Sequence, residues 1–396
     1  MDEKTSAETV ESPAVKPFPR YHILINPSAK GGRGLVLWKK IEAYLKEKNI
    51  RYEVIFTKSS EHLRLVVEKL CEHKDSRLIV LGGDGTLNQV VTSITDFDAL
   101  RVGYIPTGSG NDFARDLGLS SDPIDTLDII LRDETVHVFD VGTLEYVAQV
   151  TSKSDPTVPS ADDANRDASA NVASNSVTDN AQQNADKEPA DKGFATVNKT
   201  LSTRPEETIP LTLHDKAPAF TQTRRFVVSS GIGFDAAVCE GVATSKAKRI
   251  LGKLGLAKLV YLFIALKLIL SNKNNPCSII MDDNETLTVN KILFTAAFIH
   301  TYEGGGFPFA PDADASDGLF DICAAGDISN LTFLTNGLPL AMKGRHYELE
   351  KVHHYLCKKL EIITDKPLFV HTDGEVLAQS NHIVMRCEEK KLKMLM

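Results

Sequence analysis

The chain has 396 residues, 42% of them hydrophobic and 25% charged, a composition typical of a folded globular protein with two domains. The formal net charge of −8 argues against a nucleic-acid binder built on a broad basic face. The six scattered cysteines form neither a zinc knuckle nor a CxxC pair, and the charged N-terminus lacks the apolar core of a signal sequence. We therefore expect a cytoplasmic protein with free thiols.

The first third of the chain alternates strand patterns with helix patterns. A charged tail over residues 1–19 is expected to be disordered. Strand patterns then lie at 21–25, 52–56, 77–81 and 102–105, and helical patterns follow them at 35–45, 61–71, 87–94 and 125–131. This alternation predicts an α/β domain over residues 20–135, in which helices cover a parallel sheet.

The rest of the chain is rich in strand patterns. Strands are expected at 136–150, 224–231, 278–281, 287–300, 319–324, 359–364 and 368–372. Strands at this density predict a mainly antiparallel β-sandwich domain over residues 136–379. We expect residues 380–396 to return to the first domain and complete it.

An unusual insert over residues 151–222 separates the first two of these strands. From Thr151 to Ala190 it has no Leu, Ile, Met or aromatic residue, and its three basic and seven acidic residues contribute −4 of the net charge. Such a segment cannot bury enough apolar surface to offset its chain entropy, so we expect a disordered tip on a β-hairpin. A docking role and a tolerated loop expansion are both open.

One apolar stretch, residues 254–270, invites a membrane interpretation. Lys258 and Lys267 interrupt it and leave eight uninterrupted apolar residues. A bilayer span needs about 20 such residues, so we expect a buried or interfacial helix instead.

The strongest local signal is the glycine-rich turn Gly82-Gly83-Asp84-Gly85-Thr86, which joins an apolar strand to a helix. Glycines let the backbone approach a ligand closely, and a helix N-terminus presents free N–H groups to an anion. An aspartate would repel phosphate unless a divalent cation bridges the two. A plain turn capped by Asp84 or Thr86 is the alternative.

A second loop, residues 103–115, again runs from a strand into glycines and polar residues. Gly108, Ser109 and Gly110 can supply backbone donors, whereas Asn111 and Asp112 can cap the next helix, or Asp112 can face a substrate. A third polar turn follows the first strand at residues 26–34. In a parallel sheet all three loops lie at the carboxyl edge, where ligands bind.

These motifs, in this order, resemble the diacylglycerol kinase catalytic family, which includes bacterial lipid kinases and sphingosine kinases. The resemblance covers residues 21–396 apart from the insert, and implies an N-terminal domain like that of NAD kinase and phosphofructokinase. By this likeness, one set of residues lines the ATP site: Asn26, Pro27, Ser28, Thr57, Gly82, Gly83, Asp84, Gly85, Thr86, Gly108, Ser109 and Asn111.

Two C-terminal motifs extend the resemblance. Residues 309–321 resemble a family stretch that holds a structural magnesium, which maps to Asp314, Asp317 and the backbone carbonyl of Leu319. A turn dense in carboxylates suits such a hard cation, although a solvated acidic turn is the alternative. Residues 372–375 resemble the family's DGE element, so the likeness assigns Glu375 as the catalytic base. Without the other motifs, these residues read as a plain β-turn.

The expected function is transfer of a phosphoryl group from Mg-ATP to the hydroxyl of a membrane lipid, with diacylglycerol as the first choice. Phosphatidylglycerol and a sphingoid base are alternative acceptors, and an NAD-kinase-like enzyme with a soluble substrate or a non-catalytic lipid-binding module are alternative functions. The basic and apolar stretch at 246–258 suits peripheral contact with the inner face of a membrane, although core packing explains it equally well. No nucleic-acid partner is expected, and a homodimer is an open question.

Overall fold

The computed structural model describes residues 21–27, 33–108, 110–132, 135–148, 220, 222–243 and 274–396. Several predictions fall outside these residues: the tail 1–19, Ser28, Ser109, almost all of the insert, and the stretches 246–258 and 254–270. Within the described residues, no helix has the length and apolar character needed to cross a bilayer.

A parallel sheet forms the N-terminal domain, in the order β4-β3-β1-β2. Its strands are β1 (Tyr21–Ile25), β2 (Tyr52–Phe56), β3 (Ser76–Gly82) and β4 (Leu100–Pro106). Helices α1 (Arg33–Glu47) and α5 (Pro123–Arg132) share one buried cluster with this sheet, and α2 (Ser60–Cys71) and α3 (Asp84–Ser93) share another. Because alternate strand residues enter different clusters, both faces of the sheet are covered, as the near-continuous apolar strands predict.

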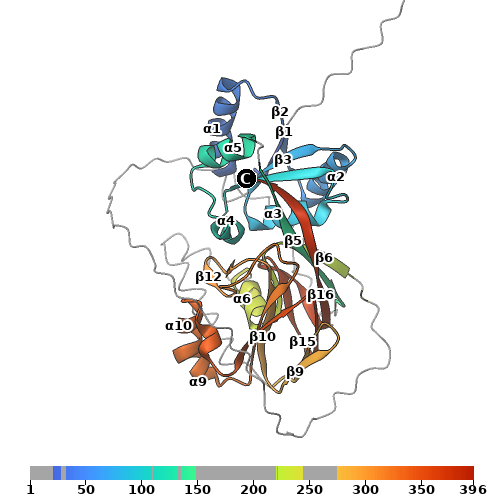
Figure 1. Cartoon of the computed structure of the whole chain (residues 1–396), viewed down its shortest axis with the longest axis vertical. Helices are drawn as coiled ribbons and strands as arrows, with labels where there is room; N and C mark the ends of the chain where they lie inside the picture. The colour runs from blue at the N-terminus through green and yellow to red at the C-terminus, as the bar shows by residue number, and fades with distance from the viewer. Residues whose placement is uncertain are drawn as a thin grey trace, which may run out of the picture. The chain divides into compact units, whose positions relative to one another are not determined.

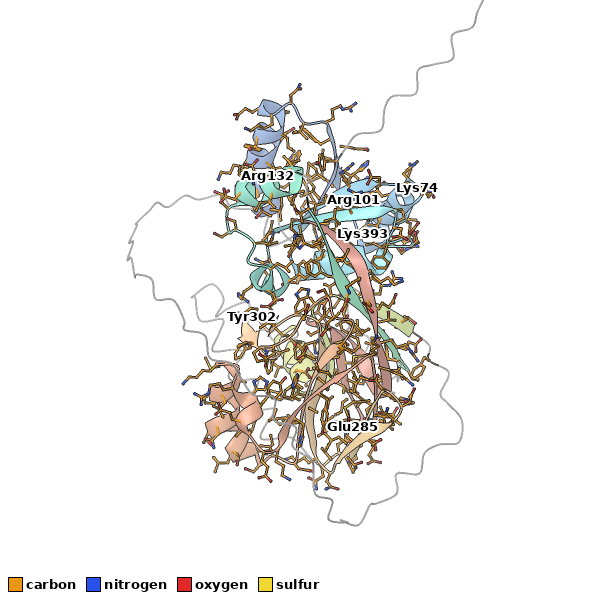
Figure 2. All side chains as sticks on the ribbon, in the orientation of Figure 1. Lys74, Arg101, Arg132, Glu285, Tyr302 and Lys393 are labelled. Carbon is orange, nitrogen blue, oxygen red and sulfur yellow. The ribbon has the colours of Figure 1, made fainter. Side chains whose placement is uncertain are left out.

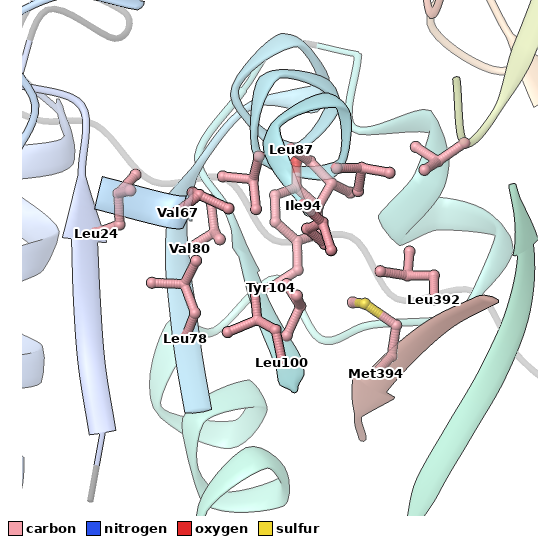
Figure 3. Packing of buried hydrophobic residues seen from close by; sticks show 14 of the residues in the cluster. Leu24, Val67, Leu78, Val80, Leu87, Ile94, Leu100, Tyr104, Leu392 and Met394 are labelled. Atoms are coloured by element: carbon pink, nitrogen blue, oxygen red, sulfur yellow. The ribbon is translucent and has the colours of Figure 1, made fainter. Parts of the chain in front are cut away.

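The last strand, β16 (Glu375–Leu395), runs from the C-terminal domain into this sheet (Figure 1). Its Met394 pairs in parallel with Val102 of β4. Figure 3 shows Leu392 and Met394 packing beside Tyr104 and Leu100 in the cluster under α2 and α3. One continuous strand therefore belongs to the cores of both domains.

The C-terminal domain is antiparallel and β-rich. Its strands are β5 (Val136–Tyr146), β6 (Gln222–Phe226), β7 (Ser229–Gly233), β8 (Cys277–Met281), β9 (Glu285–Val289), β10 (Ile292–Phe298), β13 (Phe320–Gly326), β14 (Val352–Cys357), β15 (Lys359–Thr372) and β16. A small hairpin, β11 (Tyr302–Glu303) and β12 (Phe307–Pro308), stands apart. Its helical segments are α6 (Phe234–Ala243), α9 (Asn330–Thr332), a π-helix (Phe333–Gly337), α10 (Leu338–Ala341) and a 3₁₀ turn (His346–Glu348). The short helix α4 (Asp112–Asp116) belongs to the N-terminal domain, between β4 and α5.

The predicted fold class, a parallel α/β domain followed by an antiparallel β-rich domain, is confirmed. β5 and β6 pair from Gly142 with Phe226 to Tyr146 with Gln222, so the strands that flank the insert form the predicted hairpin. Four details of the strand prediction were wrong. The stretch 224–231 is two strands, 287–300 is two strands that do not pair with each other, 359–372 is one long strand, and β14 was missed.

Two of these breaks are caused by carboxylates that lie far away in the sequence. The chain bends at Val227 and Val228 because their N–H groups bind the Asp373 carboxylate instead of a neighbouring strand. It turns at Asn290 and Lys291 because both N–H groups bind the carboxylate of Asp327. A carboxylate distant in the sequence ends the strand pairing in both places.

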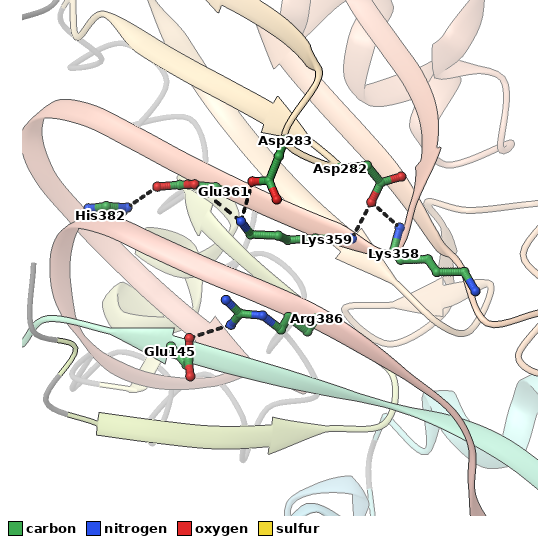
Figure 4. A network of polar contacts seen from close by, with 8 residues as sticks. All are labelled: Glu145, Asp282, Asp283, Lys358, Lys359, Glu361, His382 and Arg386. Carbon is green, nitrogen blue, oxygen red and sulfur yellow. Dashed lines mark hydrogen bonds and ion pairs between the residues drawn. The ribbon is translucent and has the colours of Figure 1, made fainter. Parts of the chain in front are cut away.

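Polar contacts line the hairpin that β15 and β16 form (Figure 4). Nε2 of His382 on β16 lies 2.7 Å from Oε1 of Glu361 on β15. A guanidinium nitrogen of Arg386 lies 2.5 Å from Oε2 of Glu145 on β5. Partly exposed ion pairs of this kind contribute at most about 1 kcal/mol each, so the apolar cluster beneath them dominates the stability of the hairpin.

Candidate active site

The two glycine-rich turns meet at the carboxyl edge of the parallel sheet. Gly82 of β3 pairs with Pro106 of β4, and α3 begins immediately afterwards with Gly83 as its N-cap. A Cβ atom on Gly108 would lie only 2.7 Å from the Cα of Gly83. Glycine at both positions is therefore what allows the two backbones to touch.

Gly82 and Gly85 of the first turn have different surroundings, so we expect their replacement by alanine to have different effects on stability and on ATP binding. A Cβ on Gly82 would lie 2.5 Å from Cβ of Thr86, whereas a Cβ on Gly85 would meet nothing within 4 Å. We expect Gly82→Ala to lower the free energy of unfolding by about 1–3 kcal/mol through overpacking. Gly85→Ala should leave stability equal or about 0.5–1 kcal/mol higher, because alanine favours a helix.

Urea denaturation and ATP-binding calorimetry on the two variants test this prediction. We expect Gly85→Ala to bind ATP more weakly despite its intact fold, since the new methyl group enters the open space at the start of α3. Full ATP affinity in a folded Gly85→Ala protein would show that no phosphate approaches this turn.

The third predicted loop follows β1 at the same edge. Ile25, the last residue of β1, pairs with Leu81 of β3, so Asn26 and Pro27 follow β1 at the level of the glycine turn. Thr57 lies just beyond β2, and both its N–H and its hydroxyl donate to the carbonyl of Ile25, at 2.9 and 3.3 Å. The parallel register thus brings the described part of the predicted ATP-site set to one edge.

A partly buried acid, Asp84, and a buried acid, Asp112, lie next to each other between the glycine turns. The Asp112 N–H donates to Oδ2 of Asp84 at 3.3 Å, and Oδ1 of Asp84 has no hydrogen-bond partner among the described residues. Burial and the neighbouring charge of Asp112 raise the pKa of Asp84 to about 6. A carboxylate that burial and a like charge both oppose is suited to bind a cation.

Burial and the neighbouring Asp112 oppose the negative charge of Asp84. We therefore predict that removing this charge increases the free energy of unfolding. Its pKa in the folded chain is above the unfolded value, so ionisation favours the unfolded chain and stability falls as the pH rises from about 4 through 6. We expect Asp84→Asn to raise the melting temperature at pH 8 but not at pH 4, and to abolish kinase activity. Melting curves at both pH values test this, with the exposed Glu350→Gln as control. A Tm gain that is equal at both pH values would contradict it.

The predicted caps of the two helices are not found. Gly83 is the N-cap of α3, and no side chain caps that helix. Asn111 occupies the N-cap of α4 in a left-handed conformation with φ of 50°, and its amide donates instead to the carbonyl of Gly108 at 3.1 Å. The polar side chains of these loops therefore organise the loops themselves rather than the helix ends.

The turn that carries the predicted base is anchored by Asp373. Asp373 and Gly374 both have positive φ values, 47° and 77°, and form the two-residue turn between β15 and β16. The Asp373 carboxylate accepts hydrogen bonds from the backbone N–H groups of residues 227–229, at 2.8–3.1 Å, and from Asn88 Nδ2 at 2.7 Å. Asn88 lies on α3, one turn after Asp84, so α3 connects the glycine turn to the Asp373 turn.

Glu375 follows this turn and remains 44% exposed at the side chain. Its Oε1 lies 4.0 Å from a guanidinium nitrogen of Arg224 on β6. The neighbouring Arg225 donates to the carbonyls of Val91 and Ile94 at the C-terminal end of α3. β6 therefore both supports α3 and places a cation beside Glu375.

A glycine-rich hairpin closes the other side of the site. Gly304, Gly305 and Gly306 all have positive φ values, and the Gly305 N–H donates to Oδ2 of Asp112 at 2.8 Å. Arg115 of α4 pairs with Asp112 and lies over the ring of Tyr302, 5.7 Å from its centroid (Figure 2 labels Tyr302). Gly306 has a φ of 110°, a conformation that strains any other residue, so glycine is required where the β11–β12 hairpin approaches Arg115 of α4.

Two protein families match separate parts of the chain. Residues 20–144 match the diacylglycerol kinase catalytic domain, and residues 227–396 match the YegS C-terminal NAD kinase beta sandwich-like domain. The chain belongs to the diacylglycerol kinase catalytic-domain family. The family is one of lipid-type kinases, which supports a phosphotransferase.

Individual relatives agree. The chain is 24% identical over 364 residues to YtlR of Bacillus subtilis, provisionally named a lipid kinase, which covers 90% of this chain and 93% of YtlR. It is 34% identical over 130 residues to a diacylglycerol kinase of Staphylococcus epidermidis, 32% of this chain and 40% of that protein. A crystal structure from Bacillus anthracis, provisionally named a diacylglycerol kinase, has a TM-score of 0.60 at 17% identity and covers 96% of this chain and 98% of that one. That structural likeness shows the shared fold.

The acidic turn predicted to hold a metal lies elsewhere, against β5 and β16. Asp314 accepts from Ser316, and Asp317 accepts from the Leu319 N–H, so each exposed acid uses one oxygen within the turn. The buried Asp140 of β5 accepts from the N–H groups of Gly318 and Lys390, at 2.7 Å each. The turn is therefore fixed by Asp140, and the remaining carboxylate oxygens suit a hard cation.

Several residues that organise the site were not among the predicted site residues. Asn88 and Asp373 each lie two residues from a predicted site residue, Thr86 and Glu375 respectively, but no role was assigned to them. Asp112 was left with two roles, and the structure gives it a third, as the acceptor for the glycine hairpin. Arg115 and Arg224 carried no separate sequence signal, because their partners lie far away in the chain.

Proposed function

We propose that this kinase transfers the γ-phosphoryl group of Mg-ATP to the hydroxyl of a membrane lipid, with diacylglycerol as the expected acceptor. Family membership supports the reaction class, and the names of relatives support the acceptor. The observation that carries the proposal is α3: its first residue belongs to the glycine turn, and Asn88 one turn later holds the turn that bears Glu375. One helix thus ties the donor-binding edge to the base.

The residues around Asp84 fit a magnesium ion. Asp84 offers a carboxylate with an unpartnered, buried oxygen, and the carbonyl oxygen of Asn111's side chain is also unpartnered among the described residues. Magnesium takes oxygen ligands and, when bound here, would neutralise the charge on the transferred phosphoryl group. The described glycines of the two turns would bind the ATP phosphates through backbone N–H groups, and Thr86, whose N–H donates to the carbonyl of Gly83, would contribute its hydroxyl. Asp314, Asp317 and the Leu319 carbonyl would hold a second, structural magnesium.

In this proposal, Glu375 accepts the proton of the lipid hydroxyl as that oxygen attacks phosphorus. The side chain is exposed enough to meet a substrate, and its backbone is fixed by the four hydrogen bonds to Asp373. Arg224 keeps a positive charge near the developing product. Positioning and charge neutralisation of this kind supply most of the catalysis in phosphoryl transfer.

A labelled-ATP assay on a lipid panel tests the acceptor. Diacylglycerol, phosphatidylglycerol and a sphingoid base are presented in mixed micelles, with NAD as the soluble alternative. We expect the largest kcat/KM with diacylglycerol and no turnover with NAD. A higher kcat/KM with another lipid would identify that lipid as the acceptor in place of diacylglycerol. Turnover of NAD would refute a lipid acceptor. Binding of a lipid without turnover of any substrate would indicate a non-catalytic lipid-binding module.

A further inference from the structure

Beneath the proposed base lies a buried cluster that the mechanism above does not use. It joins Asp235 in the first turn of α6, Glu303 on β11 and His371 on β15. His371 is fully buried, and the side chains of Glu303 and Asp235 are only 10% and 14% exposed. The three segments come from distant parts of the sequence, so the cluster is a tertiary contact in its entirety.

The two edges of the His371 ring face different parts of the site. Its Nε2 lies 2.9 Å from Oδ2 of Asp235 and 3.4 Å from Oε1 of Glu303. Its Nδ1 accepts from the N–H of Gly374, 3.4 Å away, in the middle of the turn that precedes Glu375. The ring therefore connects two carboxylates to the backbone of that turn.

Glu303 extends the connection to the glycine hairpin. It is followed directly by Gly304, Gly305 and Gly306, and the Gly305 N–H binds Asp112 between the two glycine-rich turns. Space for the cluster exists because Gly231 of β7 lacks a side chain: a Cβ there would lie 2.5 Å from Oδ2 of Asp235 and 3.0 Å from Nε2 of His371. The absence of a side chain at Gly231 therefore leaves the space that the side chains of Asp235 and His371 occupy.

We propose that Asp235, Glu303 and His371 form a positioning triad, which holds the Asp373–Gly374 turn and the β11–β12 hairpin in one fixed arrangement and thereby orients Glu375. The inference rests on the proposed function, because the triad acts on the reaction through Glu375. Because Nδ1 accepts from the Gly374 N–H, the ring proton is carried by Nε2, which faces the carboxylates of Asp235 and Glu303.

Steady-state kinetics with diacylglycerol micelles and ATP provide the first test. We expect His371→Asn and Glu303→Gln to lower kcat by about 10–100-fold with the KM for ATP changed by less than about twofold, because a small displacement of a reacting group costs about this much. The matched control is His382→Asn, on the same hairpin but paired with Glu361, and it should retain full activity. Unchanged kcat in both triad variants would overturn the proposal.

A double variant separates this inference from the proposed function. In a Glu375→Gln background, His371→Asn should lower kcat by less than about twofold further, since residues that act through one group are not additive. Multiplication of the two full effects would overturn the triad's action through Glu375. If Glu375→Gln alone keeps full turnover, the assignment of Glu375 as the base is wrong. The triad is then tested by hydrogen exchange alone.

Hydrogen exchange tests the structural role of the triad independently of kinase activity. In His371→Asn, the amides of Gly374 and Gly305 should exchange at least about tenfold faster, while that of Val67 in α2 stays unchanged. Equal acceleration at all three would show a general loss of stability and overturn the proposal. Metal analysis of the native protein is the last check: one equivalent of a divalent metal that His371→Asn loses would make the cluster a metal site instead.

Discussion

We expect Glu375→Gln to lower kcat with diacylglycerol by about 10²–10⁴-fold, the range lost when a positioned general base is removed. Glutamine has nearly the same shape but cannot accept the proton of the lipid hydroxyl. The side chain is 44% exposed and its one ion-pair contact, Arg224, lies 4.0 Å away, so the fold should be unaffected. Affinity for ATP should stay within about twofold of the parent value.

The measurement is single-turnover phosphoryl transfer, with ATP binding followed separately by calorimetry. Glu361→Gln on the same hairpin is the matched control, because that acid pairs with His382 away from the glycine turns. A Glu375→Gln enzyme with parental kcat would remove the base from the mechanism and leave positioning and charge as the only sources of catalysis.

The second large effect is on stability. We expect Asp373→Asn to lower the free energy of unfolding by about 2–4 kcal/mol, because the new NH₂ group opposes donors that the carboxylate now satisfies. Asparagine tolerates the positive φ of this position, so backbone strain does not contribute.

Urea denaturation checks this value against Asp283→Asn, at another position with positive φ, 61°, in the turn between β8 and β9. Asp283 is exposed and pairs only with Lys359 among the described residues, so its replacement should cost less than about 1 kcal/mol. Equal losses in the two variants would mean that the hydrogen bonds of Asp373 do not anchor the turn.

The two predictions concern the two ends of one short segment. Asp373 binds α3 and the β6–β7 bend, and Glu375 follows two residues later at the surface. The buried residue therefore determines stability and the exposed one determines chemistry. A catalytic group beside a rigid anchor is a common solution, since an exposed side chain cannot fix its own backbone.

Local sequence patterns were sufficient for most of the N-terminal domain. The strands at 21–25 and 52–56 were predicted to the residue, because both are short apolar-rich runs bounded by polar turns. The first is fully buried, and the second is a partly exposed edge strand. The glycine turns were also visible, since glycine is needed wherever two backbones touch. The domain boundaries and the roles of the site residues remain predictions.

Tertiary structure alone decided how the site is held together. Residues 227–228 look like the middle of a strand, and only the carboxylate of Asp373, nearly 150 positions later, makes the chain bend there. The same holds for Asp235, Glu303 and His371, which carry no shared motif and meet only over Gly231. A local pattern records which face of an element is buried, whereas a buried charge is stable only with its partners, and those partners are chosen by the fold.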